Sequence, residues 1–181
     1  GWLHAQHPAG CVRIDDTQPF EGEHSILLTT ETNTTARTWL VSETITPPGS
    51  GRLAVSLACR AEASANAASH RLRISLGATE NGKPVRYSNE FEIPKNGQWG
   101  SREVQLEALN IDAANMHSLR LTIDNLSSGR IWIDDVRLHD QFPTVSERDE
   151  LQSGAFLAVQ GLQKSNLAPA GRLLQNGWAQ Y

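Results

Sequence analysis

Aromatic side chains are the residues of this sequence best suited to holding a ligand, and they are spread along the chain. Five tryptophan and tyrosine rings stand outside the C-terminal segment: Trp2, Trp39, Tyr87, Trp99 and Trp132. A flat ring can stack on the apolar face of a ligand while neighbouring amides, guanidiniums and carboxylates bind its polar groups. The alternative is packing in the core, which we favour for Trp99. We expect the ligand-binding residues to be Trp39, Tyr87 and Trp132.

Motifs that would indicate catalysis do not occur. There is no Gly-x-Ser-x-Gly, His-Glu-x-x-His or Gly-x-Gly-x-x-Gly pattern. Carboxylates are abundant, but no phrase marks a pair suited to hydrolysing a glycosidic bond. The sequence therefore predicts a protein that is not an enzyme.

Composition and charge restrict the partners. The 181 residues include 16 Lys and Arg and 20 Asp and Glu, a net charge of −4 with both signs scattered, which argues against a nucleic-acid partner. Apolar stretches are far shorter than the roughly 20 residues that cross a bilayer, so we expect no membrane insertion.

The chain opens on Gly1 and Trp2 without a charged-then-apolar leader. We expect a piece of a larger protein, secreted or periplasmic, whose targeting signal lies elsewhere.

Short apolar runs of period two, separated by turn-forming clusters, predict antiparallel strands from about residue 10 to 140. The expected strands are Val12 to Ile14, Ser25 to Thr30, Thr38 to Ile45, Arg52 to Arg60, Arg71 to Leu76, Asn89 to Ile93, Arg102 to Leu106, Ser118 to Ile123 and Arg130 to Leu138. Asn81 with Gly82, and Asn96 with Gly97, are expected to form hairpin turns. Nine strands predict a mainly β protein with a two-sheet antiparallel jelly-roll sandwich.

The strand faces opposite the predicted core carry polar side chains. Alternate positions include Arg71, Arg73 and Ser75 on one strand and Arg120, Thr122 and Asp124 on another. Because no row of aromatic residues appears there, we expect any sugar site to lie in loops near Trp39 or Tyr87. Trp132 should face away from its neighbours Ile131 and Ile133, either exposed or covered by the C-terminal segment.

After Pro143 the pattern becomes helical. Ser146 with Asp149 forms a partial capping box, and Leu151, Phe156, Val159 and Leu162 then recur at helical spacing. A second short helix is expected near Pro169. We therefore predict a β-sandwich over residues 1–142 and a helical hairpin over residues 143–181, which must pack on the sandwich or on a partner.

The two cysteines leave a question open. Cys59 follows Leu53, Val55 and Leu57 at period two and should point into the core, where free thiols are common. Spacing alone does not decide whether Cys59 pairs with Cys11.

Four phrases, in order, resemble galactose-binding-like jelly-roll domains, particularly the carbohydrate-binding modules found beside xylanases and glucanases. The phrases are Pro19 to Leu27, Thr46 to Arg60, Asn96 to Leu106 and Gly129 to Leu138 (GRIWIDDVRL). The resemblance covers roughly residues 2 to 140. It departs from the family at Gly51 and Arg52, where an aromatic residue is usual.

The resemblance also implies a structural calcium ion. Members of this family often hold calcium between the Asp of the last strand and the loop before the early strand, which here correspond to Asp134 and to Glu21 and Glu23. Calcium takes six to eight oxygen ligands, so carboxylates and backbone carbonyls suit it. The alternative is that Asp134 and Asp135 cap a strand bulge and stay solvated.

The resemblance implies a non-catalytic module that binds a glycan and positions a larger secreted protein on it. The alternative is a structural or protein-interaction domain in which the C-terminal helices dock against other domains of the parent protein. Exposed apolar residues on those helices would favour the alternative. A jelly-roll hydrolase is the third reading.

Overall fold

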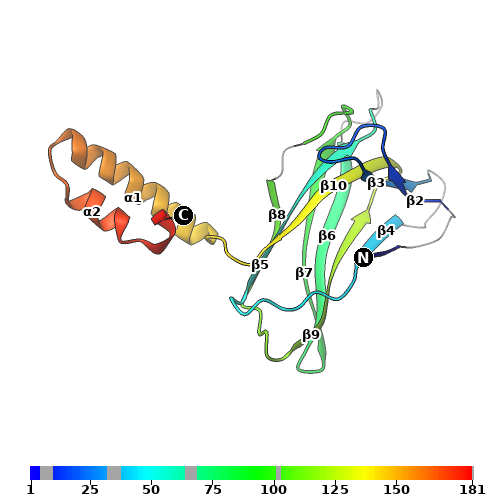
Figure 1. The fold of residues 1–181 in the computed structure, drawn as a ribbon, viewed down its shortest axis with the longest axis horizontal. Helices are drawn as coiled ribbons and strands as arrows, with labels where there is room; N and C mark the ends of the chain where they lie inside the picture. The colour runs from blue at the N-terminus through cyan, green and yellow to red at the C-terminus, as the bar shows by residue number, and fades with distance from the viewer. Residues whose placement is uncertain (5–9, 32–37, 64–68, 101–102, 181) are drawn as a thin grey trace. The chain divides into compact units, whose positions relative to one another are not determined.

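The computed structural model describes residues 1–4, 10–31, 38–63, 69–100 and 103–180. These residues form two compact units, Gly1–Asp140 and Gln141–Tyr181, and each is described by itself. The first unit contains the strands and the second contains the helices (Figure 1). The mainly β sandwich of two antiparallel sheets followed by C-terminal helices, predicted from the sequence, is confirmed.

Two five-stranded antiparallel sheets make up the first unit. The order in the first sheet is β1 (Trp2–His4), β4 (Thr38–Ser42), β9 (Met116–Asn125), β6 (Ser69–Glu80) and β7 (Lys83–Pro94). The order in the second is β2 (Val12–Asp15), β3 (Ser25–Thr30), β10 (Gly129–His139), β5 (Arg52–Ala61) and β8 (Glu103–Leu109). Among these strands, only β2 with β3 and β6 with β7 are neighbours in both sequence and sheet. Every other connection between consecutive strands crosses from one sheet to the other, and these crossings build the sandwich.

Aliphatic side chains that alternate along the strands form the core between the two sheets. Those that are almost fully buried include Leu28, Leu40, Leu57, Leu72, Ile74, Leu121, Ile123 and Ile131. Period-two alternation puts their neighbours on the opposite face of each sheet. The outer face of the first sheet is thereby left for polar side chains.

The nine predicted strands are present, and one further strand was missed. The missed strand is β1, whose three residues are too short to show a period, and which pairs antiparallel with β4. Strands β6 and β7 are longer than predicted because they pair along 12 residues each, through polar and small residues near the turn. Arg102, the first residue of one predicted strand, lies outside the described residues.

One of the two predicted hairpin turns is confirmed. Asn81 and Gly82, both with positive φ, connect β6 to β7, and Glu80 pairs with Lys83. Two successive residues with positive φ are what a type I′ turn requires. The prediction for Asn96 and Gly97 is wrong, because the chain there leaves β7 in the first sheet for β8 in the second. Those two residues turn within a crossover between sheets.

Both cysteines are buried free thiols. Cys59 belongs to the core cluster, as its period predicted. Burial raises the pKa of the Cys59 thiol to about 12. A thiol held in its neutral form is a poor nucleophile, so Cys59 acts as a small apolar core residue.

The helical unit contains α1 (Val145–Gln163), α2 (Ala168–Leu174) and a short 3-10 helix, η1 (Gly177–Gln180). The capping box at the start of α1 is made by Thr144 and Glu147, not by Ser146 and Asp149 as predicted. The Thr144 hydroxyl accepts the Glu147 N–H, and the Glu147 carboxylate accepts the Thr144 N–H. Pro stands in the first turn of α2, as predicted. No helix in the described residues is long and apolar enough to cross a membrane.

Helix α1 packs on α2 through small residues, which the sequence interpretation did not predict. Ala158 and Gly161 are its buried residues, and Gly154 and Gly161 lie against side chains of Leu173 and Pro169. Small residues let two helices approach closely, so they line the contact. The predicted apolar positions Phe156, Val159 and Leu162 are instead exposed by 55–62%.

Candidate functional site

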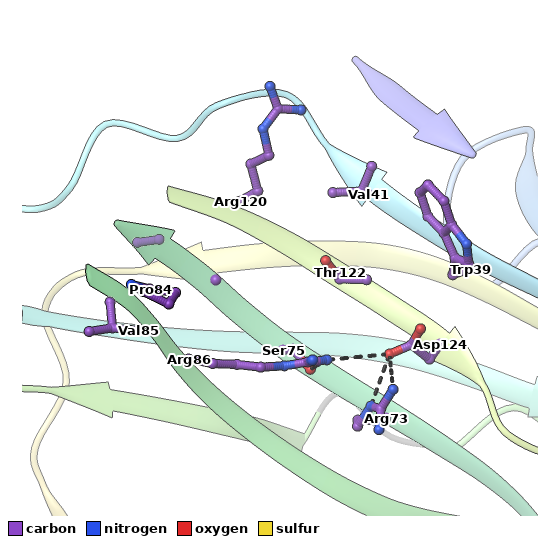
Figure 2. Close-up of a pocket in the computed structure, with 12 residues that line it drawn as sticks. Trp39, Val41, Arg73, Ser75, Pro84, Val85, Arg86, Arg120, Thr122 and Asp124 are labelled. Atoms are coloured by element: carbon purple, nitrogen blue, oxygen red, sulfur yellow. Dashed lines mark hydrogen bonds and ion pairs between the residues drawn. The ribbon is translucent and has the colours of Figure 1, made fainter. Parts of the chain in front are cut away.

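A groove of about 610 Å³ lies on the outer face of the first sheet (Figure 2). Its lining comes from the three adjacent strands β4, β9 and β6 and from the end of β7 next to the turn. The lining residues are Trp39, Val41, Arg73, Ser75, Gly77, Ala78, Pro84, Val85, Arg86, Arg120, Thr122 and Asp124. The groove therefore rests on hydrogen-bonded strands, which hold its side chains in fixed positions.

Strand register explains how these side chains meet. Trp39 of β4 pairs with Asp124 of β9, which pairs with Arg73 of β6. Residues in register on adjacent strands point to the same face, so these three form one row across the sheet.

Two more rows follow at steps of two residues. The second row is Val41, Thr122 and Ser75. The third row runs from Arg120 of β9 through Gly77 of β6 to Arg86 of β7. The groove thus has an aromatic side chain at the start of its first row and two arginines at the ends of its third.

Asp124 is the centre of a fixed ion-pair cluster. Both Nε and Nη2 of Arg73 lie 2.9 Å from its Oδ2, and Nη2 of Arg86 lies 3.7 Å from the same atom. Arg86 also donates a hydrogen bond of 2.8 Å to the hydroxyl of Ser75. Asp124 is 7% exposed, so its charge needs these partners. Figure 2 shows both arginine side chains reaching Asp124.

Among the residues that the structure describes, Trp39 is the only aromatic one that lines the groove. Its neighbour in sequence, Leu40, points into the core, and Trp39 itself is 37% exposed on the opposite face. An indole in that position can stack on the C–H face of a sugar ring, beside acceptors and donors that bind hydroxyl groups.

The groove does not contain the carboxylate pair that glycoside hydrolysis requires. Asp124 is the single carboxylate among the lining residues, and guanidinium groups hold it. The usual mechanism needs one carboxyl group that donates a proton and a second that acts as base or nucleophile.

Tyr87 does not join Trp39 at the groove. Arg86 points to the outer face of β7, and Tyr87 is packed against the core. Burial, with a smaller contribution from Glu80, raises the pKa of Tyr87. Trp39 itself lies in β4 and not in a loop, and the groove that it lines is on the face of the sheet.

Trp132 faces away from the core, as predicted, but it is only 9% exposed. Its Nε1 donates a hydrogen bond of 3.2 Å to the carboxylate of Asp15. The guanidinium of Arg60 covers its ring at 4.2 Å, and the same group lies 5.3 Å from the ring of Trp99. This stack of two rings around Arg60 leaves Trp132 no open face for a sugar.

Asp134, one of the three residues expected to bind calcium, lies at a β-bulge in β10, whereas Glu21 and Glu23 lie in the loop before β3. Asp134 accepts the backbone N–H groups of Phe20 and Glu21 at 2.7 and 3.2 Å. Asp135, with a φ of 48°, adopts the left-handed conformation. Arg137 pairs with both Asp135 and Glu21. The bulge of the alternative interpretation is confirmed, but Asp135 does not stay solvated, since its side chain is only 12% exposed.

This donor set does not fit a calcium ion. N–H groups and a guanidinium, which repel a cation, already point at the carboxylates of Asp134 and Glu21. Glu23 is 91% exposed and lies 4.0 Å from His24. No group of three or more His, Cys, Asp or Glu able to hold a metal occurs within the part of the chain that the structure describes. Calcium stays a prediction from the resemblance, and a thermal melt can test it.

Sequence reasoning found Trp39 but missed the cluster beside it. The polar alternation of Arg73 with Ser75 and of Thr122 with Asp124 was visible, and it predicted solvent-facing strands. What the sequence does not contain is the pairing of β6 with β9, which brings Arg73 to Asp124.

Solved structures with this fold include carbohydrate-binding modules. The xylan-binding domain CBM22-1 of Paenibacillus barcinonensis Xyn10C is 15% identical, with 77% of this chain and 85% of that one covered and a TM-score of 0.54. The CBM22-1 and GH10 modules of Clostridium thermocellum xylanase Xyn10B, complexed with xylohexaose, are 11% identical with a TM-score of 0.54. That match covers 76% of this chain and 26% of the xylanase, so the chain spans about a quarter of its length.

An enzyme also shares the fold. The arabinose-bound α-L-arabinofuranosidase MgGH51 is 16% identical with a TM-score of 0.55, with 82% of this chain and 24% of the enzyme covered. No family model and no curated protein matches the chain. At these identities the comparisons show the fold, and they confirm the resemblance to jelly-roll carbohydrate-binding modules stated from the sequence.

Proposed function

We propose that this chain is a non-catalytic carbohydrate-binding module, part of a larger secreted protein, and that it binds a glycan in the groove on the first sheet. The observation that carries the proposal is the placement of the half-exposed Trp39 beside the fixed Asp124 and Arg73 on the floor of an open groove. Its fold, shared with xylan-binding modules, supports the same reading.

The groove offers both kinds of contact that a sugar needs. The indole of Trp39 supplies an apolar surface, and Ser75, Thr122 and Arg86 supply hydroxyl and guanidinium groups. Charged hydrogen bonds are roughly twice as strong as neutral ones, so the arginines would fix the orientation of the hydroxyls. With one aromatic ring in place of a row of rings, we expect modest affinity.

Titration calorimetry against a panel of soluble oligosaccharides tests the proposal. The variant Trp39→Ala removes the ring from the groove and should weaken binding at least tenfold, because a stacked aromatic contributes through both area and geometry. Trp178→Ala removes a ring of the helical unit and should leave affinity unchanged. Binding that Trp39→Ala does not alter would place the glycan elsewhere and contradict the proposal.

A second function is favoured by the helical unit. Seven large apolar side chains there are 51–68% exposed: Val145, Phe156, Leu157, Val159, Leu162, Leu167 and Leu174. Such a density of exposed apolar side chains is typical of contact surfaces. We propose that these helices dock against another domain of the parent protein.

Hydrogen exchange of α1 and α2 tests this second function. The comparison is between this chain alone and the longer protein to which the proposal assigns it. Docking would slow exchange in both helices in the longer protein. Equal exchange in the two proteins would contradict docking.

A further inference from the structure

The groove has more positive than negative charge. Its lining includes the three guanidiniums of Arg73, Arg86 and Arg120 and the one carboxylate of Asp124, a net charge of +2 in a protein whose net charge is −4. A local excess of one sign inside a hollow raises the local concentration of ligands with the opposite charge. The groove is therefore electrostatically suited to an anion.

The first and third rows of the groove differ in one respect. In the first row, the protein supplies a carboxylate, since Asp124 stands next to Arg73 and within reach of Arg86. In the third row, Gly77 stands between Arg120 and Arg86 in the register of the sheet. A glycine offers no side chain, so no protein group occupies the middle of this row.

The space above Gly77 is open. A Cβ placed on Gly77 would meet no heavy atom within 4 Å, and its φ is not positive, so its conformation does not require glycine. Adjacent strands lie about 4.8 Å apart, which puts the Cα atoms of Arg120 and Arg86 roughly 10 Å from each other. Two long arginine side chains can span that distance around one planar anionic group.

Both arginines keep donors for a ligand. Arg120 donates to the carbonyl oxygen of Ser42 at 3.3 Å, a neutral acceptor. Arg86, whose side chain is 53% exposed, donates to Ser75 and lies 3.7 Å from Asp124, longer than a strong ion pair. A guanidinium has five N–H donors, so several on each arginine face the groove or solvent. Figure 2 shows Arg120 apart from the Asp124 cluster.

We propose that the groove selects a saccharide that carries a carboxylate, a uronic acid, with its carboxylate above Gly77 between Arg86 and Arg120. Arginine binds carboxylates in a planar, two-pronged geometry that a point charge does not offer. A sugar ring further along the same saccharide stacks on Trp39 in the first row, because Trp39 and Gly77 are two strands and four residues apart in the register. This inference rests on the proposed glycan-binding function and adds the substrate class.

The test compares oligogalacturonides with their methyl esters. The two ligands have the same sugar backbone, and the ester lacks only the charge. We expect the acid to bind at least tenfold more tightly than the ester, because hydrogen bonds to charged groups are worth more than neutral ones. Raising the ionic strength from about 0.01 M to 1 M should reduce this preference, since the Debye length falls from about 30 Å to about 3 Å.

Arg120→Gln identifies the residue responsible. The variant keeps a polar side chain and leaves the cluster of Arg73 with Asp124 in place. It should lower affinity for the acid about tenfold and lower affinity for the ester much less, because the ester offers only a neutral acceptor. Arg13→Gln, an exposed arginine on β2 of the other sheet, is the matched control and should change neither affinity.

The outcomes separate this inference from the proposed function. Equal binding of acid and ester that Trp39→Ala abolishes would overturn the uronate preference and leave glycan binding intact. Binding of a sulfated glycan that exceeds the acid and survives Arg120→Gln would show general anion attraction and overturn the inference. Failure of every saccharide, charged or neutral, would contradict the proposed function itself.

Discussion

The carboxylate of Asp134 accepts the backbone N–H of Phe20 at 2.7 Å, across 114 positions of sequence. This hydrogen bond ties the bulge of β10 to the loop that precedes β3, at the place where the resemblance to carbohydrate-binding modules implies calcium. The second N–H, from Glu21, reaches the same oxygen at 3.2 Å. The carboxylate therefore joins the two segments through backbone hydrogen bonds.

The two hydrogen bonds that Asp134 accepts should stabilise the fold. Asp134→Ala leaves two N–H groups without their charged acceptor and should lower the free energy of unfolding by about 1–3 kcal/mol, measured by urea denaturation. Glu23→Ala, at a fully solvated carboxylate, should leave the free energy of unfolding unchanged.

Calcium and a chelator should both leave the thermal midpoint of the unaltered protein where it is. A midpoint that rises by several degrees with calcium would support the ion that the resemblance implies.

Acid stability should depend on Asp15. Its pKa is lowered from 3.8 to about 2, first by the hydroxyl of Thr17, then by the Thr17 N–H and by Nε1 of Trp132. A depressed carboxyl pKa stabilises the fold above the unfolded value, and that contribution is lost as the pH falls from about 4 towards 2.

Asp15→Asn tests this dependence. Urea denaturation at pH 6 and at successively lower pH should show a stability difference between the parent protein and the variant that shrinks below about pH 4. Parallel curves for the two proteins would show that the Asp15 carboxylate does not stabilise the fold through its charge.

His70 should give a second, separate pH dependence. It is fully buried, and its ring nitrogen Nε2 lies 2.6 Å from Oδ1 of Asn125. Burial lowers the pKa of His70 below 6.5, and the charge of Lys95 lowers it further. The unfolded chain therefore binds a proton more readily than the folded one, so stability decreases as the pH falls below about 6.5.

His70→Gln keeps a donor for Asn125 and removes the titrating group. Between pH 7.5 and 5, the free energy of unfolding of the parent protein should fall more steeply than that of the variant, as measured by chemical denaturation. The same slope in both proteins would mean that other histidines account for the dependence.

The contact between α1 and α2 should depend on Gly161 more than on Gly154. A Cβ on Gly161 would lie 2.6 Å from the backbone oxygen of Asn166, whereas one on Gly154 would meet only the end of the Leu173 side chain at 3.1 Å. Gly161→Ala should destabilise the helical unit by about 1–3 kcal/mol, through strain that the backbone has to absorb. Gly154→Ala should be neutral or stabilising, because alanine favours a helix by about 1 kcal/mol over glycine. Far-UV circular dichroism during thermal unfolding measures both, and equal effects would contradict the packing described.

Features that depend on a few neighbouring residues could be predicted from the sequence, and features that depend on distant residues could not. Period two in Leu53, Val55, Leu57 and Cys59 is a local pattern, and it correctly predicted both a strand and its buried face. The turn at Asn81 is equally local. The turn near Asn96 was misassigned because whether a turn joins paired strands depends on partners far away in sequence. Phe156 was expected to be packed, but it is exposed. Helical spacing shows that an apolar face exists, and it does not show what covers that face.

The site was harder to predict than the fold for the same reason. Trp39 could be identified by residue type. Its neighbours Asp124 and Arg73 lie 85 and 34 positions further along the chain, and only the register of β4, β9 and β6 brings the three into one row. An ion pair inside a groove and a pair of solvated charges have the same sequence pattern, so polar alternation alone could not reveal the groove.

Gly77 offers a test in which binding and stability should change in opposite directions. Valine at this position points into open space on the floor of the groove and fills it, while a β-branched residue suits a strand better than glycine. Gly77→Val should therefore abolish glycan binding in calorimetry and keep or raise the free energy of unfolding by about 0.5–1 kcal/mol. Gly49→Val, in a loop with equally open space, is the matched control and should bind like the parent protein. A stable Gly77→Val variant that still binds glycan would exclude this groove as the binding site, since no ligand can occupy the space that the valine side chain takes.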